Sequence, residues 1–316
     1  MRILVVGAGA IGGYFGARLL QAGSDVTFLV RPARAAQLRE ALRVRSSLGD
    51  IDLPAPPLVT APQLKPGFDL ILLSCKAYDL ASAINSFTPA LDANCSILPL
   101  LNGMGHLQTL RDRCGSAALL GGSCMISSTL EPDGSILHFG GLHLITFGEL
   151  NGERSVRCDA IAAEFAKTQF DSRQSQTIVQ DMWDKWVFIA ASAAATCLMR
   201  AAVGDILKAG GEAFLIGALQ ETAGIAAANG HPFNAAMNAR AHAMLTQRDS
   251  AMMASMLRDM ERGGRIEADH IVGDLLKAAP ASAPPPARLQ SAYLHLKAYE
   301  QRREREASVA GMTQPG

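Results

Sequence analysis

The sequence predicts an α/β protein in which a doubly wound N-terminal domain is followed by an all-helical C-terminal domain. Two observations predict this class. Apolar strands alternate with helical stretches from the start of the chain, as in sheets with helices on both faces. The second half of the chain keeps the helical periodicity without further strands. We expect the domains to span residues 1–173 and 174–316.

The first thirty residues predict a strand, a tight turn, a helix and a second strand. Arg2–Val6 is an apolar run suited to a central buried strand. The helix that follows carries apolar residues on one face and ends at Gly23, which favours the left-handed conformation after a helix. Asp25–Val30 has the pattern of the second strand.

A G-x-G-x-x-G motif joins this first strand to its helix. Its residues are Gly7, Ala8, Gly9, Ala10, Ile11 and Gly12. In such a motif the first glycine permits the turn, the second lets the backbone approach a pyrophosphate, and the third packs the helix on the strand. We therefore predict a Rossmann-type dinucleotide site. The alternatives are glycines that serve only close packing, or a different nucleotide-like ligand.

The residue after the second strand indicates which dinucleotide binds. A site for NAD usually has a carboxylate about 20 residues beyond the glycines, where it binds the ribose 2′-hydroxyl. Here Arg31 stands in that region, with Arg34 three residues later and no acid nearby. A guanidinium matches the 2′-phosphate of NADP, so we predict NADPH as the cofactor. The alternative is a pair of solvated surface arginines.

Polar residues directly follow two further predicted strands. Strand 68–75 is followed by Lys76, and strand 96–101 is followed by Asn102. Ligands of open α/β sheets bind beyond the carboxyl ends of the strands. A surface lysine and a turn asparagine are the alternatives. Between the glycine motif and these strands, a short helix and a hairpin of residues 42–45 and 51–53 are expected.

From Leu119 to Glu149 the pattern changes to short strands with glycine-rich turns. The expected turns are 121–122, 133–134 and 140–141, which suits an antiparallel extension at one edge of the sheet. A helix over 156–167 and an extended piece near Phe170 then complete the first domain.

The second half predicts a series of helices. Thr177 and Gln180 form a capping box that opens a helix toward Met199. Further helices are expected over 212–228, near 234–246, 250–262 and 266–279, and over 287–304, with a disordered tail over 305–316.

Composition indicates an ordinary globular protein without a polyanionic partner. The 316 residues are 49% hydrophobic and 18% charged with a formal net charge of +0, which favours neither nucleic acid nor a membrane surface. Six scattered cysteines and seven histidines show no metal-binding spacing. The chain start lacks the layout of a signal peptide, and no apolar run reaches the roughly 18 residues of a membrane span. We expect a cytoplasmic protein without a metal.

Lys185 is the most informative residue of the second domain. Its helical neighbours three and four residues away are largely apolar, and 186–199 contains no charge. A lysine in such surroundings is suited to donate a proton near neutral pH to an oxygen that gains negative charge. The alternative is a lysine that reaches solvent and pairs with Asp181. Glu267 shares a helix face with His270 or Ile271, and it points either into a cleft or into water.

These residues together resemble the ketopantoate reductase (2-dehydropantoate 2-reductase) family over nearly the whole chain. The glycine motif is common to many folds, whereas the ordered set is specific. The resemblance rests on Gly7 to Gly12, Arg31, Lys76, the segment 101–105, Trp183-Asp184-Lys185, and Ser255 with Glu267 twelve residues later.

The resemblance implies a role for each matching residue. Lys185 is implied as the proton donor, and Asn102 as a contact of both nicotinamide and substrate. Glu267 is implied to lie beside the cofactor and the reacting centre, which makes Lys185, Glu267 and Asn102 the catalytic set. Cofactor contacts are further implied for Lys76 and, through its backbone, for Ile126. Ser255 is implied to bind the substrate near its carboxylate, together with Lys185 and Asn102.

One departure from the family pattern concerns the substrate. The family has asparagines one and two helical turns after the catalytic lysine, where they bind the pantoate part of the substrate. Ile189 and Ala193 occupy these positions here. The resemblance therefore implies NADPH-dependent reduction of a 2-oxo acid, with ketopantoate reduction for pantothenate biosynthesis as the first expectation. The alternatives are a more apolar 2-oxo acid or related carbonyl compound, and a nucleotide sensor without turnover. The sequence does not decide the oligomeric state, for which a homodimer is one option.

Overall fold

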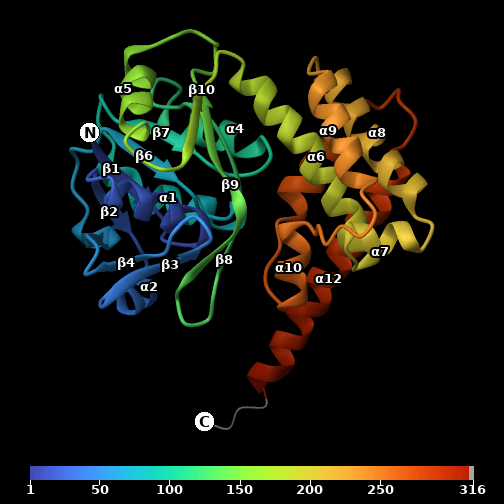
Figure 1. Ribbon diagram of the computed structural model, residues 1–316, viewed down its shortest axis with the longest axis horizontal. Helices are drawn as coiled ribbons and strands as arrows, with labels where there is room; N and C mark the ends of the chain where they lie inside the picture. Colours follow the sequence, from blue (N-terminus) through green and yellow to red (C-terminus); the bar gives the residue numbers. More distant parts are fainter. Residues whose placement is uncertain (313–316) are drawn as a thin grey trace. The chain divides into compact units, whose positions relative to one another are not determined.

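The computed structural model describes residues 1–312 and divides the chain into two compact units. Unit 1 comprises Met1–Met182 and unit 2 Trp183–Gly316. The predicted class is confirmed, because unit 1 contains a parallel sheet with helices on both faces and unit 2 is helical (Figure 1).

The parallel sheet of unit 1 has the strand order β5-β2-β1-β6-β7. All its neighbouring strands pair in parallel. The bounds are β1 Arg2–Val6, β2 Asp25–Leu29, β5 Leu58–Val59, β6 Leu70–Leu73 and β7 Ser96–Pro99. The predicted strands are confirmed, although β2, β6 and β7 are shorter than expected. Their carboxyl ends meet at one edge of the sheet, the edge at which the glycine motif follows β1.

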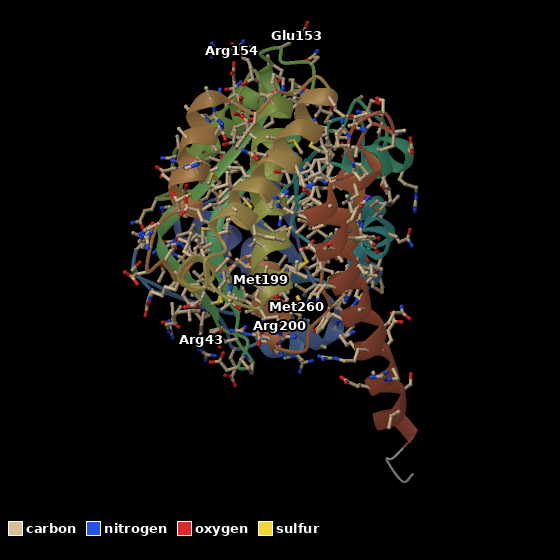
Figure 2. All side chains as sticks on the ribbon, turned by 90° about the vertical axis from the view of Figure 1, so that its right-hand side faces the viewer. Arg43, Glu153, Arg154, Met199, Arg200 and Met260 are labelled. Atoms are coloured by element: carbon tan, nitrogen blue, oxygen red, sulfur yellow. The ribbon has the colours of Figure 1, made fainter. Side chains whose placement is uncertain are left out.

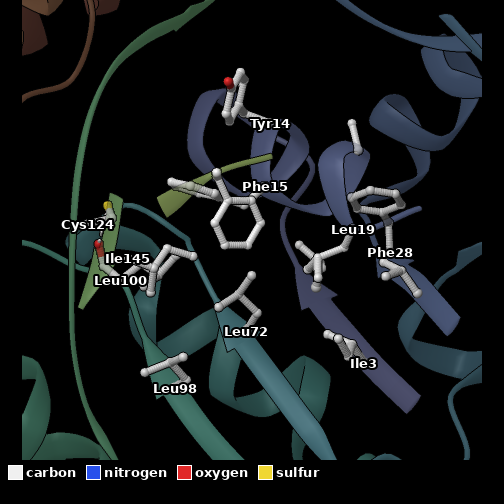
Figure 3. Close-up of a cluster of buried hydrophobic side chains, with 14 of the residues drawn as sticks. Ile3, Tyr14, Phe15, Leu19, Phe28, Leu72, Leu98, Leu100, Cys124 and Ile145 are labelled. Atoms are coloured by element: carbon white, nitrogen blue, oxygen red, sulfur yellow. Dashed lines mark hydrogen bonds between the residues drawn. The ribbon is translucent and has the colours of Figure 1, made fainter. Parts of the chain in front are cut away.

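Helices pack on both faces of this sheet because successive side chains of a strand point to opposite sides. Ile3 and Val5 belong to a core that contains Phe15 and Leu19 of α1 (Figure 3). Leu4 and Val6 of β1 belong to a second core with α3 and α4. The helix bounds are α1 Ala10–Gln21, α2 Pro32–Leu38, α3 Leu80–Phe87 and α4 Gly105–Cys114, with short 3-10 turns η1 Ala61–Gln63, η2 Ala77–Asp79 and η3 Thr88–Ala90.

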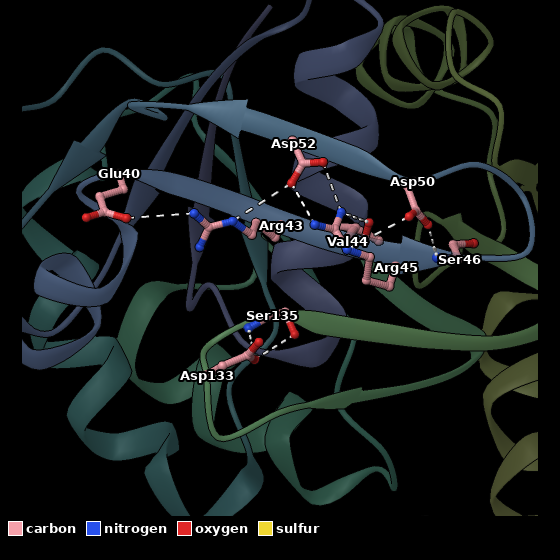
Figure 4. Close-up of polar contacts among 9 residues, drawn as sticks. All are labelled: Glu40, Arg43, Val44, Arg45, Ser46, Asp50, Asp52, Asp133 and Ser135. Carbon is pink, nitrogen blue, oxygen red and sulfur yellow. Dashed lines mark hydrogen bonds and ion pairs between the residues drawn. The ribbon is translucent and has the colours of Figure 1, made fainter.

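Residues 121–148 form two long strands of a second sheet, and a parallel bridge between Leu119 and Ile97 joins this segment to the edge of the parallel sheet. The expected antiparallel pairing is confirmed, whereas the expectation of short strands with turns at 121–122 and 140–141 was wrong. The strands are β3 Ala41–Ser46, β4 Ile51–Pro54, β8 Gly121–Leu130, β9 Ile136–Gly148 and β10 Asp171–Gln174. Their order is β10-β9-β3-β4, and β8 pairs with β9 in antiparallel register. The predicted hairpin of β3 and β4 is confirmed, and it belongs to this sheet. Figure 4 shows it beside the turn that contains Asp133 and Ser135.

The error arose because strand glycines resemble turn glycines in the sequence. Gly134 does lie in a turn, with φ +83°. Gly122 instead lies within β8, where a β-carbon would overlap with the carbonyl oxygen of Pro99. Gly140 and Gly141 lie inside β9. Glycine inside a strand often marks a bulge or a close approach of another backbone. Unit 1 then continues through α5 Val156–Phe165, shorter than expected, to the start of α6.

The helices of unit 2 follow the predicted order, with one additional helix and with shorter or longer bounds for several of the others. Their bounds are α6 Ile178–Met199, α7 Val203–Lys208, α8 Glu212–Ala228, α9 Ala235–Leu245, α10 Ser255–Glu261, the π-helix η4 Asp269–Gly273, α11 Asp274–Lys277 and α12 Ala287–Met312. Helix α7 was not predicted. Helix α12 continues beyond Glu304 to Met312, so residues 305–312 are helical instead of disordered, and the rest of the expected tail, 313–316, lies outside the described residues.

Polar contacts join the helices within unit 2, as two examples show. Glu221 of α8 accepts the backbone N–H groups of Arg288 and Leu289, at 3.2 and 3.0 Å, and so caps the start of α12. Arg200 follows α6 and pairs with Glu261 at the end of α10, 2.8 Å apart, next to the labelled Met260 in Figure 2. None of the helices within residues 1–312 combines the length and apolar character needed to cross a membrane.

Candidate functional site

The glycine loop, Gly7 to Gly12, turns the chain from β1 into α1. Gly7 has φ +94°, a conformation that favours glycine, and its N–H donates to Leu29 O of β2 at 3.1 Å. Helix α1 starts at Ala10 with Gly9 as its N-cap, where the cap residue contributes no side-chain hydrogen bond. Its first turn contains no acidic residue. The N–H groups and the positive end of the helix dipole therefore favour an anion at this point.

Side chains from three other elements bind the carbonyl oxygens of the glycine loop. Ser74, which follows β6, donates to Val6 O and Gly7 O at 3.1 and 3.2 Å. Arg34 Nε donates to Ala8 O at 2.9 Å. Ser128 Oγ on β8 donates to Ala10 O at 3.1 Å. These bonds fix the orientation of the peptide planes. The carbonyl oxygens of the loop therefore point toward the protein.

The glycines of the loop differ in the space around them. A β-carbon on Gly12 would overlap with Ser74 Oγ and Gly7 O, so Gly12 is required for the packing of α1 on the strands. A β-carbon on Gly9 would meet no described atom within 4 Å. Gly9 thus leaves open space at the helix start, as the approach of a pyrophosphate requires. The loop fits a dinucleotide by this test.

The two arginines that follow β2 have different surroundings. Arg31 is exposed over 66% of its side chain, and its Nη2 lies 3.1 Å from Oδ1 of Asp79. Arg34 is turned toward the protein, where its Nη1 also donates to Gly134 O at 3.0 Å and Nη2 is buried. Burial lowers the pKa of Arg34. Arg31 therefore offers a guanidinium to a ligand, whereas Arg34 fixes the glycine loop to the β8–β9 turn.

Asp79 is a site residue that the sequence analysis missed. The sequence near Arg31 contains no acid, but the end of η2 brings this carboxylate to the arginine. The sequence did contain one signal for this role. Asp79 stands three residues after Lys76, in the segment that follows β6.

Lys76, Asn102 and Ile126 lie on other segments of unit 1. Lys76 is the N-cap of η2 after β6, and Asn102 follows β7; both are half-buried. Ile126 is the last residue of β8 before a register shift in its pairing with β9. The extra residues at this bulge, 140–142, belong to β9, and bulges are frequent beside active sites. Lys76 and Asn102 thus lie at the carboxyl ends of strands that pair side by side in the parallel sheet.

Lys185 lies on α6 and is half-buried in unit 2. Hydrogen bonds fix the residues before and after Lys185 in the sequence. Asp184 accepts the N–H of Asn234 at 3.1 Å, and Trp186 Nε1 donates to Ile271 O at 2.9 Å. The latter bond ties the Lys185 segment to η4. The carboxylate of Asp181 accepts hydrogen bonds from Arg173, at 2.8 Å, and from Ser175.

Glu267 is buried, with 7% of its surface exposed, and precedes the π-helix η4 by two residues. Single π-turns are frequent at functional sites. The first residue of η4, Asp269, accepts bonds from Tyr293 Oη at 2.6 Å and Lys297 Nζ at 3.1 Å, both on α12. Burial opposes ionisation of Asp269, but these two donors outweigh it and lower its pKa. The Asp269 carboxylate in turn raises the pKa of Tyr293 to about 12. Helix α12 therefore anchors the segment that carries Glu267.

One face of α6 carries a row of three residues at four-residue steps, Lys185, Ile189 and Ala193. Ser255 is exposed at the first position of α10. The start of α10 is attached to α6, since Ala254 N donates to Oγ1 of Thr196 at 3.3 Å. Ser255 thus directly follows a residue that is bonded to α6 three positions beyond Ala193.

The site candidates fall into two groups. Unit 1 carries the glycine loop, Arg31, Lys76, Asn102 and Ile126, and unit 2 carries Lys185, Ser255 and Glu267. No cluster of three or more His, Cys, Asp or Glu side chains suited to a metal occurs in the described part of the chain. The six cysteines, all within the described residues, form no disulfide with one another.

Comparisons with known proteins agree on one family. The family model "Ketopantoate reductase PanE/ApbA" matches residues 3–152, and "Ketopantoate reductase PanE/ApbA C terminal" matches residues 177–300. The chain is 37% identical over 305 residues to the uncharacterized oxidoreductase YkpB of Bacillus subtilis (strain 168), covering 95% of this chain and 99% of that protein.

Solved structures show the same architecture. The 2-dehydropantoate 2-reductase from Methylococcus capsulatus is 28% identical with a TM-score of 0.84, covering 96% of this chain and 98% of that one. A D-mandelate dehydrogenase in a ternary structure with NADH and anilino(oxo)acetate has a TM-score of 0.86 at 19% identity, covering 96% of this chain and all of that one (100%), and shares the fold.

Proposed function

We propose that this chain, which belongs to the ketopantoate reductase family, reduces a 2-oxo acid to the corresponding 2-hydroxy acid with NADPH. Family membership makes it an oxidoreductase. The first candidate substrate is 2-dehydropantoate, the substrate in the name of the Methylococcus relative, which would place the enzyme in pantothenate biosynthesis. We further propose a cytoplasmic location, in keeping with six cysteines that form no disulfide, and a homodimer stays a prediction.

The glycine loop is the observation that carries this proposal. Its carbonyl groups are bound by Ser74, Arg34 and Ser128, and its helix start is open at Gly9. Such a loop binds the pyrophosphate of a dinucleotide through backbone N–H groups. The exposed guanidinium of Arg31 supports a 2′-phosphate at the adenosine end, and therefore NADPH.

NADPH, when bound, supplies the hydride that the carbonyl carbon of the substrate accepts. Lys185 donates the proton that the carbonyl oxygen then requires, from a half-buried position at which an ammonium is only partly solvated. Asn102 contacts the nicotinamide and the substrate, and Glu267 lies beside the reacting centre. Lys76 and the backbone of Ile126 contact the cofactor, and Ser255 binds the substrate near its carboxylate. The chain thereby orients both reactants, which supplies a large part of the rate.

A second candidate substrate is a more apolar 2-oxo acid or related carbonyl compound. Ile189 and Ala193 favour it, because neither side chain can bond to a substrate hydroxyl. The fold itself is compatible with such a reaction, since one protein that shares it is a D-mandelate dehydrogenase.

Oxidation of NADPH by the full-length protein with a panel of 2-oxo acids tests the proposal. The panel contains ketopantoate, branched hydroxyl-free 2-oxo acids and phenyl-substituted ones, with the Lys185→Ala variant as the control for background oxidation. We expect turnover with at least one member of the panel. Tight NADPH binding without turnover on any member would favour a nucleotide sensor and contradict the proposal.

A further inference from the structure

Arg31 and Asp79 form an ion pair beyond the carboxyl ends of the two strands that flank β1. Arg31 lies two residues beyond β2, and Asp79 ends the turn η2 that follows β6. These strands flank β1 on its two sides, and the glycine loop leaves the sheet at the end of β1. The pair, with Nη2 and Oδ1 3.1 Å apart, therefore joins the two neighbours of β1 at the edge where we propose that the cofactor binds.

Helix capping does not explain why the carboxylate of Asp79 lies at Arg31. Asp79 stands at the N-cap of α3, a position that aspartate often occupies because its oxygen accepts an N–H of the first turn. Its side chain makes no such capping bond to α3. The carboxylate reaches Arg31, with 28% of the Asp79 side chain exposed.

The carboxylate affects the two nicotinamide cofactors in opposite ways. A 2′-phosphate at Arg31 brings a second negative group close to Asp79, and like charges at this distance repel. A free 2′-hydroxyl brings a donor that a carboxylate accepts, as in sites for NAD. Because Arg31 is largely exposed, an incoming phosphate can displace the carboxylate from the guanidinium.

We propose that Asp79 sets the preference of this site between NADPH and NADH. Arg31 provides affinity for the 2′-phosphate. Asp79 reduces that affinity and accepts a hydrogen bond from the 2′-hydroxyl. The ratio of NADPH to NADH affinity is therefore smaller than it would be with Arg31 alone. This inference rests on the proposed dinucleotide site. It assigns a specificity-determining role to a residue outside the glycine motif.

The test compares dissociation constants of NADPH and NADH for the full-length protein and its Asp79→Asn variant. Calorimetry at low ionic strength measures both. Removing the charge should tighten NADPH binding about threefold to tenfold, because one like charge near the phosphate is lost. NADH binding should stay the same or weaken. The gain for NADPH should shrink in about 0.5 M salt, since exposed charges are screened.

Asp25→Asn is the matched control. Asp25 also pairs with an arginine, its Oδ2 lying 3.4 Å from Nε of Arg2, but at the amino ends of β1 and β2, the opposite edge of the same sheet. Neither cofactor affinity should change in this variant. Asp79→Ser serves as the second variant if Asp79→Asn folds poorly, and it should shift the preference in the same direction.

Two outcomes would overturn the inference. One is a ratio of NADPH to NADH affinity that stays within about twofold of the parent in both Asp79 variants. The other is an equal loss for both cofactors, which would assign Asp79 to the fold. A parent protein that binds neither cofactor would instead refute the proposed function itself, so the two failures are distinguishable.

Discussion

The hydroxyl of Tyr14 lies 2.7 Å from Nδ1 of His143, and both side chains are buried in unit 1. The two residues come from α1 and β9. With the hydroxyl as donor, Nδ1 accepts the bond, and the imidazole is neutral. Burial lowers the pKa of His143, and the neighbouring His138 and Arg18 add to this effect. The opposing influence of Asp171 and of a backbone hydrogen bond to Gln169 is smaller.

We predict that unit 1 loses stability when His143 is protonated. The folded pKa lies below the unfolded value of about 6.5, so the unfolded chain binds more protons below that pH. The free energy of unfolding should therefore fall as the pH drops from about 6.5 toward the folded pKa, by at most about 1.4 kcal/mol per pH unit for this one group. Urea denaturation at pH 7.5 and 5.5 measures the loss.

The His143→Asn variant should show a smaller loss between the two pH values than the parent. His242→Gln is the control, because His242 is exposed and should leave the pH dependence unchanged. An equal loss in the parent and in His143→Asn would contradict the prediction.

We expect different results from alanine substitutions at two glycines of the loop, Gly12 and Gly9. Gly12→Ala should destabilise unit 1 by about 2 kcal/mol or more, because its β-carbon overlaps with Gly7 O, which belongs to the backbone. Gly9→Ala should leave the thermal stability nearly unchanged and weaken NADPH binding at least tenfold, since the methyl group enters open space at the phosphate site. Thermal melts with and without NADPH measure both. Unchanged NADPH affinity in Gly9→Ala would refute the phosphate site.

Arg31→Ala should weaken NADPH binding without a comparable effect on NADH. Charge-assisted bonds to the 2′-phosphate contribute roughly 1.5–3 kcal/mol, which corresponds to about 10- to 150-fold in affinity. Arg154→Ala is the control, because Arg154 is also exposed and paired, 3.0 Å from Asp159. If both cofactors lose affinity equally, Arg31 supports the fold and does not read the phosphate.

Lys185→Ala should lower turnover by about 10²- to 10⁴-fold, the usual range for a positioned general acid, and leave NADPH binding largely intact. Lys277→Ala, which removes an exposed lysine paired with Asp274, should leave turnover unchanged. Steady-state kinetics and calorimetry separate the two effects. Turnover of Lys185→Ala within about threefold of the parent would exclude a role as proton donor.

Local patterns predicted most of the fold, and long-range pairing accounts for the rest. The span of α8, Glu212–Ala228, agrees with the periodicity at both ends, because apolar spacing and Asn229-Gly230 are local signals. The pairing of β9 with β3 joins segments far apart in the sequence, and no local pattern encodes it. The same distinction explains which residues of the candidate site were predicted from the sequence and which were not. Arg31 was evident from its place after β2, whereas Asp79 becomes its neighbour only because β2 and β6 flank β1.

The last prediction is that ketopantoate is not the best substrate. An asparagine aimed at a substrate hydroxyl makes bonds that Ile189 and Ala193 cannot make, and a hydroxyl desolvated without a partner costs about 1–3 kcal/mol. Two such losses amount to roughly 10²- to 10⁴-fold in recognition if they are independent, although neighbouring sites seldom add fully. A branched or aromatic 2-oxo acid without the hydroxyl avoids this cost. Apolar contact with Ile189 would add about 25 cal/mol per Å² of buried area.

We therefore expect a higher kcat/KM for a hydroxyl-free 2-oxo acid than for ketopantoate, and a shift toward ketopantoate in the variant with Ile189→Asn and Ala193→Asn. Ile189 is half-buried, so an asparagine at 189 should keep some access to solvent, whereas Ala193 is only 2% exposed. An asparagine at 193 must bond to the substrate or remain buried without a partner, so the double variant should be less stable without ligand. Ile189→Asn alone is the variant that changes specificity with the least effect on folding. A kcat/KM of the parent for ketopantoate above that for every hydroxyl-free analogue would overturn the prediction, because the missing amides would then have to come from another segment.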